Sequence, residues 1–328
     1  MTIQLRGVVL LHLKKLVKRN KLRFLELYHS LCKITIFSIF LVICAGGFVR
    51  MTGSGMGCPD WPKCFGYWTP PTDISQLPTN YKEIYANRGY DTLDFNVFNT
   101  WTEYINRVLG VISGLFCFVL LVVGWLTKNN KLFFLSLFLV LLMGFQAWMG
   151  ALVVYSVLAP FKITIHMLIA LLILSVLLFL YQLTKRRAVS ADVINSKWIW
   201  LALIASIIQV ILGTQVREGV DTLLHYIDRV NIIKDLPFVF EMHRTMAWLV
   251  VTSNILLIYC YRKLFNSHFE LKAIIMVIGA IFLSGLLMSY HNLLGLYQLL
   301  HLLLAVSLYL CQLSFLLKQS NLPSLRSL

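Results

Sequence analysis

The sequence predicts an all-α polytopic membrane protein, with eight transmembrane helices arranged as two pseudo-symmetric four-helix bundles. Three observations predict this fold: the composition, the length of the apolar runs and a weak internal duplication. Of the 328 residues, 59% are hydrophobic and only 13% are charged, whereas a soluble domain carries about a quarter charged residues. The apolar runs are long enough to cross a bilayer core at about 1.5 Å per helical residue.

The distribution of charge indicates how these spans are oriented. We expect the spans at 34–52, 104–126, 132–155, 161–183, 198–215, 239–261, 272–290 and 296–317. If the N-terminus is cytoplasmic, most of the 29 Lys and Arg residues fall in cytoplasmic segments. Cytoplasmic loops are enriched in these residues, so the net charge of +15 indicates topology and no nucleic-acid partner. We therefore expect a multi-pass protein of the inner (plasma) membrane with both termini in the cytoplasm.

An internal duplication divides the chain. A Gly-x-x-Val-Arg motif ends at Arg50 and again at Arg217, Asn106-Arg107 corresponds to His243-Arg244, and His166 corresponds to His301. An even number of spans per half gives both halves the same orientation about an axis along the membrane normal. The alternative is chance similarity between two apolar bundles. The duplication predicts a basic cytoplasmic tail at 1–33, a first half at 34–185 with a long outside loop at 53–100, a second half at 186–317 and a cytoplasmic tail at 318–328.

Two further local patterns predict structure more than chemistry. Cys58 and Cys64 lie close together in the first outside loop. A pair that faces an oxidising compartment can form a disulfide, and the alternative is two unpaired thiols. The second pattern, a Gln followed four residues later by Gly, predicts close helix approach. It occurs at Gln146-x-x-x-Gly150 and Gln209-x-x-x-Gly213.

Five polar residues lie near the outer ends of the four spans that enter the membrane from outside. They are Glu103, Asn106, His166, His243 and His301, all expected at one level about 5 to 10 Å deep. Ionisable residues inside a membrane usually face a bundle interior or a polar cavity. A lone His there can simply bond to a neighbouring helix. Three at one depth on alternate helices favour a shared function.

The histidines are suited to binding haem iron, for which imidazole is a common axial ligand. His243 and His301 can hold a haem between two facing helices of a bundle. In the first half, His166 has Asn106 in the partner position, and an amide is a poor iron ligand. This asymmetry predicts a retained haem in the second half and an exchangeable or reactive haem in the first.

The charged residues at the same level have two interpretations each. Glu103 can act as a general base or stabilise positive charge on a substrate, or it can be solvated or ion-paired with Arg107. Four arginines can bind haem propionates or extend their side chains to the lipid headgroups. They are Arg50, Arg107, Arg217 and Arg244.

This pattern resembles the haem A synthase family over residues 34–317. The residues that carry the resemblance are Gly47-Phe48-Val49-Arg50-Met51-Thr52-Gly53-Ser54-Gly55, the Cys58–Cys64 loop, Glu103-Tyr104-Ile105-Asn106-Arg107, His166, His243-Arg244 and His301. The resemblance implies that the C8 methyl group of haem O is oxidised to the formyl group of haem A, for cytochrome oxidase assembly. It also implies that Glu103 is essential and that only some members have the cysteine pair. Many members have His where this chain has Asn106.

The residue pattern, taken together with the resemblance, predicts two sets of site residues. We expect haem b as cofactor at His243, His301, Arg244 and Arg217. We expect the substrate haem at His166, Asn106, Arg107 and Arg50. The implied partners are haem O, membrane lipid, a haem O synthase and an electron donor, and a homo-oligomer is compatible with the sequence.

Two other functions fit parts of the pattern. A bis-histidine cytochrome b could carry electrons from quinol without modifying haem, but it gives no role to Glu103 or to the cysteine loop. A transporter with parallel repeats would need a polar pathway through both leaflets. The polar residues here are confined to the outer side.

Overall fold

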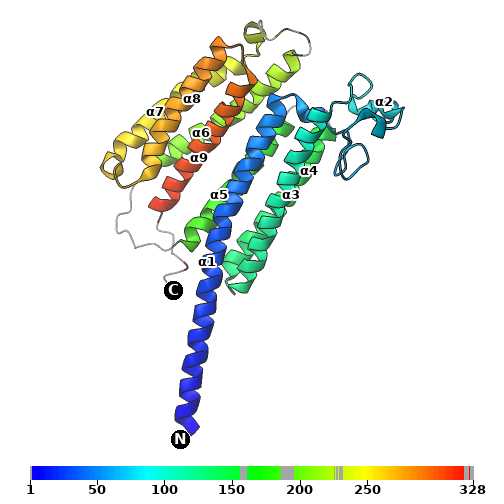
Figure 1. Cartoon of the computed structure of the whole chain (residues 1–328). Helices are drawn as coiled ribbons and strands as arrows, with labels where there is room; N and C mark the ends of the chain where they lie inside the picture. Colours follow the sequence, from blue (N-terminus) through cyan, green and yellow to red (C-terminus); the bar gives the residue numbers. More distant parts are fainter. Residues whose placement is uncertain are drawn as a thin grey trace.

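The computed structural model describes residues 2–155, 161–185, 196–224, 226, 228, 232–320 and 325, with side chains from Lys18 onward. The described part is helical and contains no strand (Figure 1). The predicted start of the second half at 186 and most of the predicted tail at 318–328 lie outside the described residues. The eight long helices are α1 (Thr2–Met51), α3 (Val97–Leu126), α4 (Asn130–Tyr155), α5 (Lys162–Thr184), α6 (Lys197–Leu223), α7 (Val239–Cys260), α8 (Phe269–Tyr290) and α9 (Gly295–Gln319).

Short helices occupy the connections between the long ones. The loop between α1 and α3 contains α2 (Tyr81–Ile84) and the 3-10 helices η1 (Ser54–Met56), η2 (Ile74–Gln76) and η3 (Ala86–Arg88). The connections after α6 and α7 contain η4 (Ile232–Asp235) and η5 (Arg262–Leu264). The predicted spans and the long helices therefore coincide in order, with small differences at their ends.

Seven of these helices are long and apolar enough to cross a membrane, within the part of the chain that is described. The exception is α7, which coincides with the span predicted at 239–261. Its 22 residues include Glu241, His243, Arg244 and Asn254, and these polar side chains lower its hydropathy. The polytopic helical fold is confirmed, with seven spans supported by hydropathy and the eighth still a prediction.

Helix α1 is much longer than the span predicted within it. It runs without interruption for 50 residues, so the expected tail at 1–33 continues the membrane helix toward the N-terminus. Figure 1 shows this end of α1 extending beyond the ends of the other helices. Packing against the other helices begins by Leu25 and Tyr28, which are both buried.

The long helices contact one another in two rings. In the first bundle, as we call α1, α3, α4 and α5, each helix contacts two neighbours in that order, and α5 closes the ring on α1. In the second bundle, α6, α7, α8 and α9 make the equivalent ring, with α9 on α6. The bundles meet through α1 with α9, α5 with α6 and α5 with α9. Exchanging the two bundles leaves this contact pattern unchanged, as a twofold arrangement requires.

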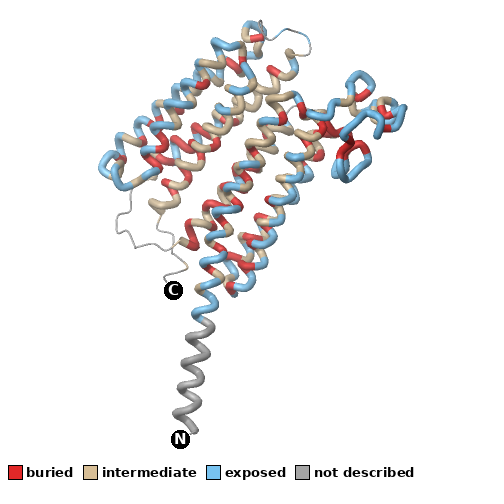
Figure 2. The backbone as a smooth tube through the Cα atoms, in the orientation of Figure 1, coloured by how far each residue is buried: buried red, intermediate tan, exposed pale blue. Residues whose placement is uncertain are grey.

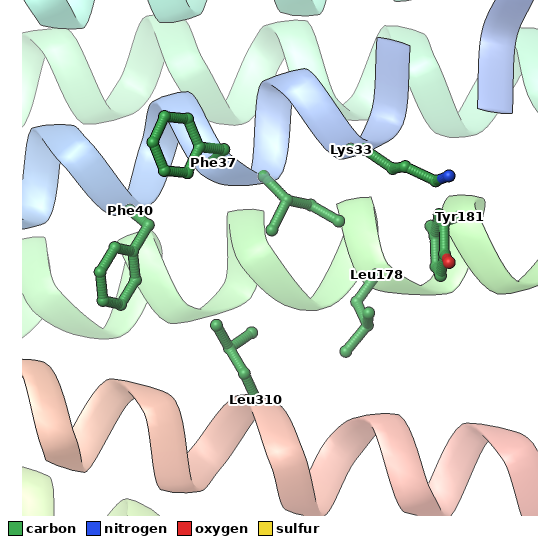
Figure 3. Close-up of a pocket in the computed structure, with 7 residues that line it drawn as sticks. Lys33, Phe37, Phe40, Leu178, Tyr181 and Leu310 are labelled. Carbon is green, nitrogen blue, oxygen red and sulfur yellow. The ribbon is translucent and has the colours of Figure 1, made fainter. Parts of the chain in front are cut away.

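Burial follows the pattern of a membrane protein. Figure 2 shows buried residues along the helix faces that meet and exposed residues along the outward faces. Many of the outward residues are large and apolar, including Phe134, Leu141 and Trp248. Extended apolar surface of this kind suits a lipid environment. A groove of about 290 Å³ opens between α1, α5 and α9, lined by Phe37, Phe40, Leu178 and Leu310 among others (Figure 3).

The loop from Thr52 to Asn96 folds on the end of the first bundle where α3 begins (Figure 1). We call this the loop end of the molecule; every site residue named below lies near it. Phe65 anchors the loop through edge-on contacts with aromatic rings, the nearest being Tyr90 at 5.4 Å and Phe95 at 5.5 Å. Burial raises the pKa of the Tyr90 phenol, which therefore stays protonated and donates to the Met56 carbonyl.

Candidate functional site

In the second bundle, His243 of α7 and His301 of α9 come together. Their ring centroids lie 6.2 Å apart, with the ring planes at 62°. Ser284 bonds to His301 Nδ1 at 2.8 Å, which leaves Nε2 of that ring available. Gln209 donates to the His243 backbone carbonyl at 3.0 Å. A Cβ on Gly213 would lie only 3.2 Å from His243 Cε1, so this glycine lets the ring lie against α6.

The first bundle has a His and an Asn at the corresponding positions, His166 for His301 and Asn106 for His243. His166 of α5 lies against Gly150 of α4, where a Cβ would meet Cε1 at 3.6 Å. Gln146 donates to the His166 carbonyl at 3.1 Å. Asn106 of α3 occupies the position that corresponds to His243, and its amide would lie 3.9 Å from a Cβ on Gly46 of α1. Each of the four positions therefore packs against a glycine on a neighbouring helix, the fourth pair being His301 and Gly285.

Several of these polar atoms are buried without a partner. Within the described residues, no hydrogen bond reaches Nδ1 of His166, Nδ1 of His243 or Oδ1 of Asn106. Buried polar groups are nearly always satisfied, so unpaired ones indicate a missing partner. The residues fit a haem. A bond from a metal to an imidazole nitrogen is about 2 Å long. A metal between the two rings could therefore reach a nitrogen of each at the 6.2 Å that separates the ring centroids of His243 and His301. No cluster of three or more His, Cys, Asp or Glu suited to a metal ion occurs in the described residues.

Glu103 lies beneath the loop at the start of α3. Its side chain is 6% exposed and pairs through Oε1 with Arg107 at 2.5 Å. Its Oε2 accepts from the Cys58 backbone N–H at 3.1 Å. Thr100 donates to the Gly57 carbonyl at 2.9 Å and holds the same stretch of loop on α3. The ion pair with Arg107, one of the two interpretations open from the sequence, is therefore present.

The glycine before Cys58 is needed for this contact. A Cβ on Gly57 would lie 2.3 Å from the Asn99 carbonyl oxygen and 2.8 Å from the Thr100 nitrogen, closer than atoms can approach. Cys58 and Cys64 form a disulfide with their Cα atoms 4.9 Å apart, which confirms the predicted bond. Both cysteines are fully buried.

The four predicted arginines have different surroundings. Arg50 of α1 pairs with Asp221 of α6, and Arg217 pairs with the same carboxylate at 2.7 Å. This cluster joins the two bundles at the loop end. Arg107 is directed to the loop, whereas Arg244 is 60% exposed and contacts Glu241 at 3.4 Å. The structure therefore does not bring the four arginines to one place.

Sequence reasoning missed Asp221 and Ser284 as functional candidates and gave Gln146 and Gln209 a different role. Asp221 and Ser284 are single polar residues with no motif around them, so the sequence contains no signal for them. The two glutamines did carry a signal, because each lies four residues before a glycine. That pattern predicted close helix approach, and the structure shows that a His is what approaches in each case.

Comparison with known proteins identifies relatives along most of the chain. Over 189 residues the chain is 32% identical to "Heme A synthase" of Shewanella oneidensis, and the match covers 56% of this chain and 54% of that protein. The chain thus spans about half the length of that relative. The match to the protein of the same name from Pelagibacter ubique is 28% identical and covers 84% of this chain and 92% of the relative. The protein of that name from Rickettsia prowazekii is 26% identical, with 74% and 81% covered.

A family model covers more of the chain than the first of these relatives. The model, described as a cytochrome oxidase assembly protein, matches residues 29–313. The matched region includes the disulfide, Glu103, Asn106, His166, His243 and His301. The chain belongs to the COX15-CtaA family of cytochrome oxidase assembly proteins.

Proposed function

We propose that this chain is a haem A synthase, which oxidises the C8 methyl group of haem O to the formyl group of haem A. The observation that carries the proposal is a buried carboxylate, Glu103, that has no counterpart at the corresponding position of the second bundle. Glu103 lies four residues before Arg107, and the corresponding residue in the second bundle, four before Arg244, is Phe240. A buried carboxylate is therefore found at only one of the two sites, as a reactive site beside a retained cofactor requires.

In this proposal the second bundle holds haem b between His243 and His301. The bound haem supplies a redox-active iron that can exchange electrons with the substrate site. Ser284 fixes the ring of His301, and Gln209 fixes the backbone of His243. Partners of this kind orient metal-binding histidines and set which ring nitrogen is free. We assign no rearrangement of these side chains to haem binding.

The first bundle would take haem O. His166 offers one strong ligand, and Asn106 offers a weak one in the corresponding position. A haem held strongly on one face only can be exchanged, which suits a substrate that must enter and a product that must leave. Arg50 lies beside Arg217, which is proposed for haem b, at the loop end between the bundles. Arg50 could bind a propionate of haem O by charge-assisted hydrogen bonds.

Glu103 would act on the substrate methyl group. Oxidising a methyl to a formyl group releases protons, and a carboxylate positioned beside the carbon can accept one as a general base. The same charge can stabilise positive charge that develops on the macrocycle. The Cys58 N–H and the Arg107 guanidinium hold the two oxygens of Glu103 in fixed positions. Precise placement of this kind is what general-base catalysis needs.

The finer assignments belong to the same proposal. They place the protein in the inner membrane with both termini in the cytoplasm, and divide it into two four-helix domains. A haem O synthase would supply the substrate, and an electron donor or acceptor would complete the redox reaction. A bis-histidine cytochrome b that leaves haem unmodified is not favoured, because it gives no role to a carboxylate buried beside a disulfide.

Haem extraction tests the proposal. The chain would be expressed in a host that makes haem O and no haem A, and the membrane haems would be identified by mass. We expect haem A with the parent chain and none with His166→Ala, while both retain haem b. If the parent accumulates only haem O and haem b, the proposal is wrong.

A further inference from the structure

Arg107 and Arg244 occupy corresponding positions, 137 residues apart, and each follows the residue at a ligand position of its bundle. Their surroundings differ sharply. The Arg107 side chain is 12% exposed, whereas that of Arg244 is 60% exposed. The sequence predicts that both bind haem propionates. Arg107 is much the less exposed of the two, and the described contacts of its guanidinium are to protein groups.

The contacts of Arg107 converge from two directions. One nitrogen, NH2, pairs with Glu103 Oε1 at 2.5 Å and lies 3.5 Å from the Cys58 carbonyl oxygen. The other, NH1, donates to the carbonyls of Asp60 at 2.7 Å and Lys63 at 2.9 Å. All three carbonyls belong to the segment that the Cys58–Cys64 disulfide closes into a ring. The guanidinium thus bonds both to the backbone of this ring and to the Glu103 carboxylate.

We infer that Arg107 is a positioning residue, which locks the disulfide-closed loop onto α3 and thereby fixes Glu103, and that it does not serve as a propionate ligand. This inference deepens the proposed function and rests on it for the role of Glu103. A planar guanidinium with five donors can serve several acceptors at once, which a lysine ammonium on a flexible chain does poorly. The chemistry of Arg107 therefore matches the arrangement of four acceptors.

The disulfide and Arg107 stabilise each other's position. The disulfide holds the carbonyls of Cys58, Asp60 and Lys63 within reach of one cation. The cation in turn holds the loop closed, so that the Cys58 N–H reaches Glu103 Oε2. Removing the guanidinium leaves three carbonyls and a buried carboxylate without their partner. The loop should then open more often, and the buried disulfide should become accessible.

The test measures the loop and the chemistry separately, in Arg107→Gln, Arg107→Lys, Arg244→Gln and Lys82→Gln. Lys82 is the loop control, because it pairs with Asp94 in an exposed salt bridge of the same loop. The first readout is the rate at which a membrane-impermeant phosphine reduces the disulfide, with the thiols trapped by alkylation and counted by mass. The second is conversion of haem O, with the haem b spectrum as a measure of folding.

We expect Arg107→Gln to speed reduction of the disulfide by about tenfold or more, since the closed loop then lacks its hydrogen bonds to a charged group. Arg244→Gln and Lys82→Gln should change that rate by less than about twofold, as expected for exposed charges. Arg107→Lys keeps a positive charge beside Glu103 but loses the planar guanidinium that can donate to several acceptors at once. It should restore part of the conversion while leaving the disulfide easily reduced, a split that a general loss of stability would not produce.

Two results would overturn the inference. One is a disulfide in Arg107→Gln that is reduced as slowly as in the parent. The other is loss of the haem b spectrum in both Arg107 variants, which would show that Arg107 is needed for folding as a whole. Failure of the proposed function is distinguishable, because a parent that makes no haem A still reports on the loop through its rate of reduction.

Discussion

The close approach of Gly213 to His243 leads to a quantitative prediction. In Gly213→Ala the new methyl carbon would lie 3.2 Å from His243 Cε1 and 3.7 Å from Nδ1, whereas carbon atoms prefer about 3.5–4.0 Å. The ring must therefore move by a few tenths of an ångström. The backbone of His243 cannot easily retreat from α6, because Gln209 of that helix donates to its carbonyl at 3.0 Å.

The strain should appear when haem binds. Without haem the ring can rotate away from the methyl, but a ring bonded to iron cannot. Overpacking of this kind costs about 1–3 kcal/mol, which is about a 5- to 150-fold loss of haem affinity at 1.4 kcal/mol per tenfold. The matched control is Gly285→Ala, where the new methyl lies 3.6 Å from His301 Cε1, an ordinary contact. Alanine favours a helix by about 1 kcal/mol over glycine in both variants, so that effect cancels in the comparison.

The assay is haem loss from the purified protein to excess apomyoglobin, followed by the low-spin spectrum. We expect Gly213→Ala to lose haem at least about fivefold faster than the parent and Gly285→Ala to match the parent. Equal haem retention in both variants would refute the reasoning, because it would mean that His243 does not bind iron with its ring placed against Gly213 as in this structure. Faster haem loss in Gly285→Ala alone would also refute it, because it would mean that His301, and not His243, is the histidine crowded by its glycine.

Three further predictions concern the ligands and the loop. Replacing either His243 or His301 with Ala should abolish the low-spin haem spectrum, and its survival in both single variants would reject the ligand assignment. Cys58 and Cys64 should appear as one linked peptide in non-reducing mass mapping, and two freely alkylated thiols would contradict the disulfide. Asn106→His should raise haem per protein and shift the added iron toward low spin, because it supplies a second imidazole. Unchanged stoichiometry would mean that Asn106 does not face the iron.

The fold was largely predictable because membrane helices are encoded locally. Runs of apolar residues set the helices, and the duplication predicted which polar residues correspond. Helix α7 shows where this reasoning is weakest. Glu241, His243 and Arg244 lower its hydropathy, so polar residues near a site weaken the hydropathy signal of the helix that contains them. The N-terminal part of α1 was assigned to a tail, because a basic segment gives no apolar signal even where it continues a helix.

The site was predictable in its residue types but not in its contacts. Helical spacing placed Glu103 near Asn106, and the repeat paired His166 with His301. The contact of Glu103 with the Cys58 backbone could not be predicted, because it depends on how a 45-residue loop folds back on α3. The different surroundings of Arg107 and Arg244 have the same cause. Arg107 contacts that loop, whereas among the described residues Arg244 contacts Glu241 of its own helix.

The loop contacts also explain why a charge-removing variant needs a structural control. Glu103→Gln keeps an oxygen that can accept from the Cys58 N–H but loses the ion pair with Arg107. Slower haem chemistry in that variant could then reflect a loosened loop. The rate of disulfide reduction, measured on the same preparation, separates the two causes: an unchanged rate leaves the loss of the carboxylate charge as the explanation.

The most direct test of the central claim measures haem composition in Glu103→Gln. Haems would be extracted from the purified variant and parent, both produced with haem O available, and quantified by mass. Because Glu103 belongs to the first bundle, we predict a parental amount of haem b, a disulfide reduced at close to the parental rate, and little or no haem A. Parental amounts of haem A in Glu103→Gln would contradict the account, because the buried carboxylate that only the first site has would then be dispensable.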